Sequence, residues 1–365
     1  MGFSVSARIG LGFGFLYHML TPAYYRFAQQ CGATHAVVHL VDYSGSGAGP
    51  DDGRWTLGAL RALKAELNDH QLQLAAIENF DPAHWHDILL DGPKRRAQME
   101  GLKRIVRDLG AAGIPIMGYN FSLAGVASRT SGPYARGGAI SAAMEGVDDT
   151  PMPRGMVWNM VWDRQAAPGS VPAITHEELW RRFEAFLQEL IPVAEQAGVR
   201  LALHPDDPPA PTVRGQPRLV YLPHLYRRAL DLVPSSSNAL EFCLGSLAEM
   251  EESDVYALTE AHAAAGEIAY VHFRNVVGKV PDYREVFVDE GELDMPRIVE
   301  ILSRTGFNGV LVPDHTPLME EPGGWHSGVA HCLGYMRGLL QMMERCEVVQ
   351  SVATEDGGAS MMHRG

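Results

Sequence analysis

The chain has 365 residues, of which 46% are hydrophobic and 20% charged, a size and composition that suit one large α/β barrel. Its formal net charge of −14 argues against nucleic acid or an anionic membrane surface as a partner. The four cysteines show no paired spacing, and no signal-peptide pattern opens the chain. No apolar run approaches the roughly 20 residues of a membrane span. We therefore expect a cytoplasmic protein.

The first third of the chain alternates strand and helix patterns. Short apolar runs predict strands, and amphipathic stretches that begin at Thr21 or Thr56 predict helices. The first strand contains a Gly-x-Gly-x-Gly sequence, but it lacks the helix entry and the acidic residue of a dinucleotide-binding fingerprint. The expected strands cover residues 9–16, 34–40, 72–77 and 114–117, and the expected helices cover residues 21–30, 56–69 and 93–112.

Residues 122–175 break this alternation. Gly, Pro, Ser, Met and single charges follow one another without a helical or strand period, and so long an irregular stretch is unusual inside a compact domain. The segment is either a disordered insertion or a lid over the mouth of a barrel. We favour the lid because βα loops build barrel active sites, and because Arg129 and Arg136 could contact an anion.

The alternation resumes after the insertion. A capping-box pattern at residues 175–178 predicts a long helix, and four further apolar runs each predict a strand. The expected fold is therefore a single (β/α)₈ TIM barrel over residues 1–346, with residues 122–175 inserted after the fourth strand and a disordered tail over residues 347–365. The other expected elements are helices at residues 175–197, 295–304 and 327–344 and an excursion with a charged tip at residues 283–291.

Each of the last four strands ends in a residue that can bind a metal ion, namely His204, Cys243, His272 and Asp314. Taken singly, a His or Cys in an apolar run is more often a satisfied core residue. However, the spacings suit one βα unit each, and the carboxyl ends of parallel strands meet at one mouth of a barrel. We therefore expect the four side chains to bind one divalent ion.

Five motifs stand out: Tyr119-Asn120-Phe121, His204-Pro205-Asp206-Asp207-Pro208-Pro209, Phe242-Cys243-Leu244-Gly245-Ser246, His272-Phe273-Arg274-Asn275 and Pro313-Asp314-His315. Together they resemble the mannonate dehydratase family, over residues 102–339. The resemblance implies a xylose-isomerase-like barrel with a divalent metal, typically Mn²⁺, on the four strand-end residues. It also implies dehydration of D-mannonate to 2-keto-3-deoxy-D-gluconate. Fe²⁺, Co²⁺ and Zn²⁺ are alternatives, because a thiolate with two imidazoles also suits zinc.

Dehydration of a 2,3-dihydroxy acid requires a base for the C2 proton and an acid for the departing C3 hydroxyl. The resemblance implies a catalytic role for His315, whose ordinary pKa range suits either task. The alternative is that His315 only supports the neighbouring metal ligand. We expect the sugar acid to be bound by polar residues of these motifs and of the insertion, namely Asn120, Arg129, Asp206, Arg274 and Asn275.

The chain departs from the family pattern at the second catalytic position. The family has a tyrosine before the last helix, where this chain has Trp325-His326-Ser327. Because an indole cannot accept a proton, we expect His326 to be the acid and D-mannonate to be a poor substrate or none. The alternative is that this segment only leads into the helix, with Ser327 as its N-cap. The family also has an arginine where this chain has Val312, and a small polar residue where this chain has Glu241.

Three functions fit these observations. The first is metal-dependent dehydration of a sugar acid, D-mannonate or a relative. The second is a metal-dependent sugar isomerase or epimerase, in which paired carboxylates such as Glu78 and Glu241 move the proton. The third is a binding protein for a sugar acid that has lost its catalytic acid. The sequence does not determine the oligomeric state, and a homo-oligomer is compatible with it.

Overall fold

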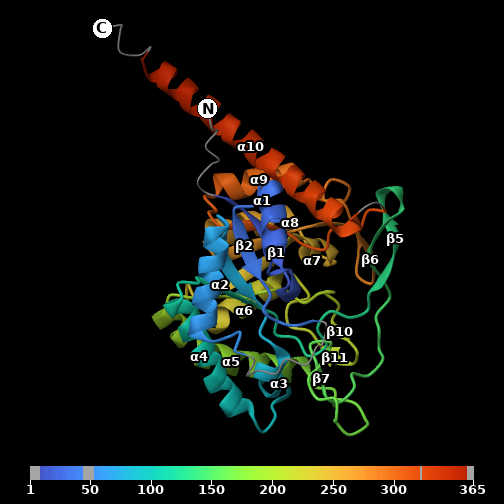
Figure 1. Cartoon of the computed structure of the whole chain (residues 1–365). Coiled ribbons are helices and arrows are strands. Elements are labelled where there is room, and N and C mark those ends of the chain that lie inside the picture. The colour runs from blue at the N-terminus through green and yellow to red at the C-terminus, as the bar shows by residue number, and fades with distance from the viewer. Residues whose placement is uncertain (1–8, 44–52, 321–322, 360–365) are drawn as a thin grey trace.

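Eight parallel strands close into a barrel in the computed structural model, which describes residues 9–43, 53–320 and 323–359 (Figure 1). Each strand pairs with its two neighbours in chain order, and the last strand pairs with the first. The predicted (β/α)₈ fold is therefore confirmed. The barrel strands are β1 (Gly10–Phe15), β2 (His35–Val38), β3 (Gln73–Glu78), β4 (Ile116–Tyr119), β9 (Arg200–Leu203), β12 (Asn238–Cys243), β13 (Ile268–Phe273) and β16 (Val310–Pro313).

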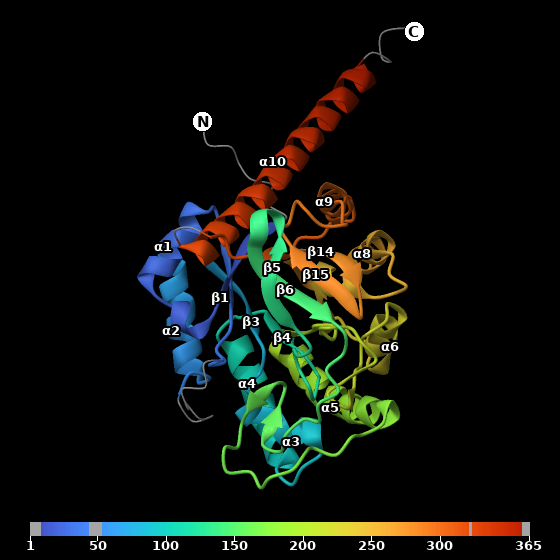
Figure 2. The ribbon, with the colours of Figure 1, turned by 90° about the vertical axis from the view of Figure 1, so that its right-hand side faces the viewer.

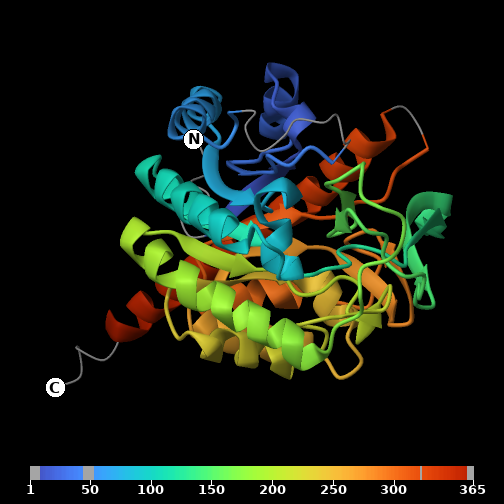
Figure 3. The same cartoon turned by 90° about the horizontal axis from the view of Figure 1, so that it is seen from below.

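Helices surround the barrel on its outside (Figure 3). Helix α9 (Met295–Arg304) has the predicted bounds. Helix α3 (Pro82–Leu90) has no counterpart among the predicted elements, although Asp81 caps it and a proline fills its first position. The other helices are η1 (Tyr17–Met19), α1 (Pro22–Gln30), α2 (Leu57–Asp69), α4 (Arg95–Ala111), η2 (Arg136–Gly138), α5 (His176–Ala197), α6 (His224–Leu232), α7 (Leu244–Glu249) and α8 (Val255–Ala264).

The barrel strands are buried on both faces, because helices cover the outside and side chains fill the inside. All residues of β4 and β13 are buried. Inside the barrel, the small side chains of Ala76 and Ala202 pack in one cluster with the larger Ile116 and Tyr270. The interior is therefore solid, and the place for chemistry is the carboxyl end of the barrel.

The insertion between β4 and α5 is folded rather than disordered. Its strands β5 (Thr130–Ala135) and β6 (Ala139–Glu145) form an antiparallel hairpin. Strand β6 also pairs with β15 (Asp282–Val286), which pairs with β14 (Asn275–Lys279). A second hairpin, β14 and β15, thus extends the sheet of the insertion (Figure 2), and the excursion predicted at residues 283–291 overlaps only the second strand of this hairpin. Four shorter strands are β7 (Met156–Val157), β8 (Met160–Val161), β10 (Thr212–Val213) and β11 (Gln216–Pro217).

The last helix, α10 (Gly324–Ala359), is longer than predicted and continues beyond the barrel (Figures 1 and 2). The helix includes residues 347–359, for which the sequence predicts a disordered tail, and residues 360–365 lie outside the described residues. After residue 338 the helix contains no proline and no glycine before Gly357, so no strong helix breaker ends it earlier. Neither α10 nor any other described helix combines the length and the apolar composition of a membrane span.

Candidate active site

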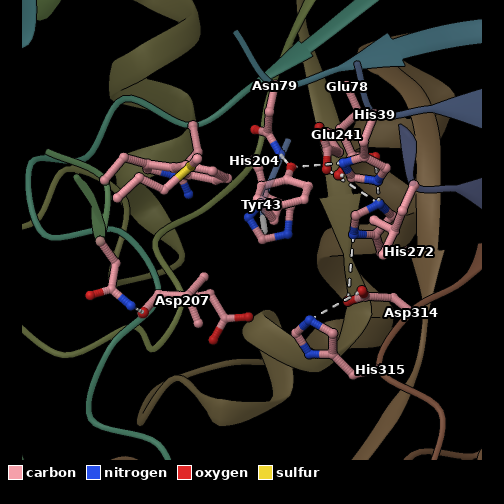
Figure 4. A pocket seen from close by; sticks show the side chains of 16 residues that line it. His39, Tyr43, Glu78, Asn79, His204, Asp207, Glu241, His272, Asp314 and His315 are labelled. Carbon is pink, nitrogen blue, oxygen red and sulfur yellow. Dashed lines mark hydrogen bonds and ion pairs between the residues drawn. The ribbon is translucent and has the colours of Figure 1, made fainter. Parts of the chain in front are cut away.

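A cavity of about 400 Å³ lies at the carboxyl ends of the barrel strands (Figure 4). Four carboxylates line it, and none of the described residues that line it is a lysine or an arginine. Side chains of the insertion form part of its wall. The lining residues are Leu16, His39, Tyr43, Glu78, Asn79, Asn120, Val126, Trp158, Asn159, Met160, His204, Asp207, Glu241, His272, Asp314 and His315.

The structure brings the four expected metal ligands together. Cys243 and His272 are direct neighbours on adjacent strands. His204 follows β9, and ligand atoms of His204, Cys243 and His272 all lie within 4.8 Å of one another. The Oδ2 atom of Asp314 lies 4.0 Å from the Sγ atom of Cys243 and 3.5 Å from the Nδ1 atom of His272.

These side chains fit a divalent metal ion. The Nδ1 atom of His272 is buried and has no hydrogen-bond partner among the described residues, although it faces Asp314. Burial raises the pKa of the Cys243 thiol, but Arg274 and His204 outweigh this effect and hold the pKa well below its ordinary value. A thiolate, two imidazoles and a carboxylate are donors that divalent first-row ions accept. The set therefore can hold such an ion without selecting one metal.

Two buried carboxylates stand on the other side of the His272 ring. The Oε2 atom of Glu78 and the Oε1 atom of Glu241 lie 3.2 and 3.3 Å from the Nε2 atom of His272. Burial and the charge of Glu78 raise the pKa of Glu241. Burial opposes ionisation of Glu78 as well, but His39 and His272 outweigh it and lower the pKa of Glu78. Glu78 is therefore the charged member of the pair.

Two residues of the cavity wall, His39 and Tyr43, were not among the predicted site residues. The Nδ1 atom of His39 lies 2.9 Å from the hydroxyl of Tyr43, and the side-chain amide of Asn79 donates to the same hydroxyl over 3.1 Å. The Nε2 atom of His39 lies 3.5 Å from Glu78. His39 follows β2 directly, so the rule that strands of this chain end in functional residues could have identified it.

His315 lines the cavity and is held by residues from two hairpins. Its Nδ1 atom lies 2.9 Å from the Oε1 atom of Glu285 on β15 and 3.1 Å from the Nη1 atom of Arg129, which precedes β5. The backbone of His315 has a φ of 45°, in the left-handed region that few side chains other than glycine adopt. Such strain is found where the surrounding contacts impose a conformation, often at functional sites.

The two arginines that were expected to bind the substrate are bound by carboxylates of the protein. The guanidinium of Arg274 is buried and lies 2.8 Å from Asp207, 2.6 Å from Glu249 and 3.0 Å from Asp314. Arg129 pairs with Asp207 and Glu285. Neither arginine lines the cavity. The structure therefore places both in the wall behind the site rather than at its surface.

Asn120 and Asp206 were also predicted to bind the substrate, but only Asn120 lines the cavity. Asn120 lines the cavity, and its buried Oδ1 atom has no hydrogen-bond partner among the described residues. The carboxylate of Asp206 accepts hydrogen bonds from the backbone N–H groups of Leu219 and Val220, both over 2.8 Å. Asp206 thus fixes a loop, and the neighbouring Asp207 lines the cavity in its place.

Asn275 and His326 lie away from the cavity. The amide of Asn275 donates to two backbone carbonyls of the segment that follows β15. His326, in the first turn of α10, stacks on Tyr24 with ring centroids 5.5 Å apart and packs edge-on against Phe27 at 4.8 Å. Because α1 carries both partners, His326 joins two outer helices. This position gives His326 no part in the lining of the cavity, and it does not support the predicted acid role.

The chain is similar in sequence to proteins of one family. A family model described as D-mannonate dehydratase (UxuA) matches residues 26–145 and 155–350. A mannonate dehydratase of Streptococcus suis (strain 05ZYH33) is 31% identical over 277 residues, which make up 72% of this chain and 74% of that protein. Mannonate dehydratase 1 of Bacillus licheniformis is 31% identical over 287 residues, or 73% of this chain and 77% of that protein.

Solved structures give the same result for the fold. The crystal structure of mannonate dehydratase from Streptococcus suis serotype 2 superposes with a TM-score of 0.76 at 28% identity, covering 93% of this chain and 95% of the other. The structure of an L-ribulose 3-epimerase has a TM-score of 0.57 at 16% identity, covering 94% of this chain and 98% of the other. At that identity, the second likeness concerns the fold alone.

Proposed function

We propose that this chain, which belongs to the D-mannonate dehydratase family and is a hydro-lyase, converts a sugar acid to a 2-keto-3-deoxy acid. In this proposal the reaction requires a divalent metal ion. The candidate substrate is D-mannonate or a related aldonate, and the candidate metal is Mn²⁺. The observation that carries the proposal is the convergence of His204, Cys243, His272 and Asp314 beside the cavity.

A divalent ion bound by these four residues would stabilise the negative charge that develops on the substrate carboxylate when the C2 proton leaves. The protein itself offers no lysine or arginine at the described cavity surface, since Arg129 and Arg274 are paired with carboxylates. The histidines of the cavity are therefore the basic side chains that remain to face an anionic substrate.

His315 is the base that we assign to the C2 proton. Its Nδ1 atom can donate to Glu285 over 2.9 Å, so the Nε2 atom, which lies 3.4 Å from the Oδ1 atom of Asp314, is the nitrogen to which we assign the proton. The contact with Arg129 limits rotation of the ring on the same side. A base whose orientation is fixed in this way loses little entropy when it meets the C–H bond.

The screen that tests this function uses the whole protein, freed of metal and reloaded with Mn²⁺. Hexonates and pentonates, D-mannonate among them, are supplied singly, and 2-keto-3-deoxy acids are measured. We expect one or a few acids to lose water, and only with metal present. Absence of any 2-keto-3-deoxy product from a fully loaded protein would reject the function.

A second candidate function is supported by the carboxylate pair. Glu78 and Glu241 lie side by side in the same cavity, and each is within 3.3 Å of His272. Two carboxyl groups, one charged and one protonated, can take a proton from a carbon next to a carbonyl and return it. This arrangement would serve an isomerase or epimerase of neutral sugars. Formation of a sugar isomer without loss of water would identify that activity.

A further inference from the structure

The side chains of Glu78, His39 and Tyr43 form a series of polar contacts along the wall of the cavity. The Oε1 atom of Glu78 lies 3.5 Å from the Nε2 atom of His39, and the Nδ1 atom of His39 lies 2.9 Å from the hydroxyl of Tyr43. The amide of Asn79 donates to the same hydroxyl over 3.1 Å. A carboxylate thus supports an imidazole that supports a phenol, and all four residues line the cavity.

The insertion holds the ring of Tyr43 in place. Trp158, in the turn between β7 and β8, lies against Tyr43 with ring centroids 5.8 Å apart. The turn itself is fixed by Gly125, where a Cβ atom would come within 2.5 Å of the Trp158 backbone. Trp158 and Asn159 both have positive φ values, of 53° and 56°. Several independent contacts therefore fix the phenol at the edge of the site.

We propose that Tyr43 is the catalytic acid that protonates the departing C3 hydroxyl. The inference rests on the proposed function, because it assigns a residue to the second half of that reaction. His315 takes the C2 proton, the C3–O bond breaks, and the Tyr43 hydroxyl gives its proton to the leaving oxygen, which departs as water. The resulting enol becomes the 2-keto acid by moving its hydroxyl proton to C3.

The contacts of Tyr43 suit this role. The phenolate left after proton transfer receives a hydrogen bond from Asn79 and, when Nδ1 is protonated, one from His39. Both donors are in place before the reaction, so they stabilise the charge without reorganisation. Tyr43 regains its proton from solvent and His315 releases one, which balances the reaction.

The experiment compares Tyr43→Phe with a matched control, Tyr24→Phe, which alters a tyrosine on α1 away from the cavity. Each Mn²⁺-loaded protein is assayed on the acid that the screen identifies as the substrate, D-mannonate or a related aldonate, and on the 3-deoxy-3-fluoro analogue of that acid. Fluoride leaves without needing a proton from an acid, so the second substrate bypasses the step assigned to Tyr43. Metal content is measured for each variant.

We expect Tyr43→Phe to lower kcat for dehydration of that acid by about 100-fold or more, while release of fluoride from the fluoro analogue and the metal content stay near those of the wild type. Tyr24→Phe should change none of these quantities. Unchanged dehydration in Tyr43→Phe, or an equal loss of both reactions, would overturn the assignment while leaving the proposed function in place. A wild-type protein that forms no 2-keto-3-deoxy product from any acid of the screen would reject the proposed function, and the assignment of Tyr43 with it.

Discussion

The Nε2 atom of His272 lies 3.2 Å from the Oε2 atom of Glu78, while the Nδ1 atom of the same ring lies 3.5 Å from Asp314. A carboxylate that accepts the Nε2 hydrogen fixes the tautomer of the imidazole and leaves Nδ1 free to bind a metal. Glu78 thereby determines which nitrogen of the His272 ring is available to bind a metal ion.

Removal of this support should weaken the metal site. We expect Glu78→Ala to raise the dissociation constant for Mn²⁺ by about 10- to 100-fold, as outer partners of metal ligands do elsewhere. Glu78→Gln keeps an acceptor for the Nε2 hydrogen and should lose less. Titration of metal-free protein with Mn²⁺, followed by electron paramagnetic resonance, measures both. Equal affinities in the wild type and Glu78→Ala would show that another residue orients His272.

His315→Asn should lower turnover by about two orders of magnitude or more, because it removes the proposed base. The metal content should not change, since Asp314 and the other expected ligands remain. Steady-state kinetics and elemental analysis on the same preparations provide the test. If the variant lost its metal together with its turnover, His315 would be a support for Asp314 rather than a base.

Arg274→Met should destabilise the fold strongly, because it removes the buried partner of Glu249 and leaves only Arg129 to pair with the neighbouring Asp207 and Glu285. Breaking a buried ion pair by removing one member costs about 3–5 kcal/mol. The matched control is Arg136→Met, whose pair with Asp289 is largely exposed and is worth less than about 1 kcal/mol. Urea unfolding compares the two. Equal small losses would mean that the carboxylates accept protons or solvent at little cost.

His326→Ala should leave turnover and the choice of substrate unchanged, because the ring packs against Tyr24 and Phe27 on the outer layer. A modest loss of stability is expected from the lost packing. Kinetic constants on the acids of the screen are the measurement. A selective loss of kcat would restore the role that the sequence suggested for His326.

The strand ends explain why much of the site could be predicted. Cys243 and His272 lie at the carboxyl ends of β12 and β13, and His204 follows β9, so the topology of a parallel barrel alone brings them together. The same rule applied to β2 would have included His39, and applied to β3 it would have placed Glu78, which was named only for the isomerase alternative, in the same site. No further information was needed for those two residues.

The rest of the site depends on side-chain directions that no local pattern encodes. Asp206 and Asp207 are adjacent and chemically alike, yet one binds backbone N–H groups and the other lines the cavity. Arg274 was expected at the surface of the site, but three buried carboxylates from distant segments surround it. His326 was expected at the site because of its position in the sequence before the last helix. The packing of α10 on α1 instead directs the ring of His326 against Tyr24.

The central claim is that one ion, held by His204, Cys243, His272 and Asp314, serves the dehydration of a sugar acid. The most direct test measures metal content and 2-keto-3-deoxy acid formation in parallel for wild type and Cys243→Ala, after removal of metal and reloading with Mn²⁺. We predict about one ion per wild-type chain, formation of product that requires it, and the loss of both in the variant. Product formation by metal-free protein, or by Cys243→Ala at the wild-type rate, would contradict the claim.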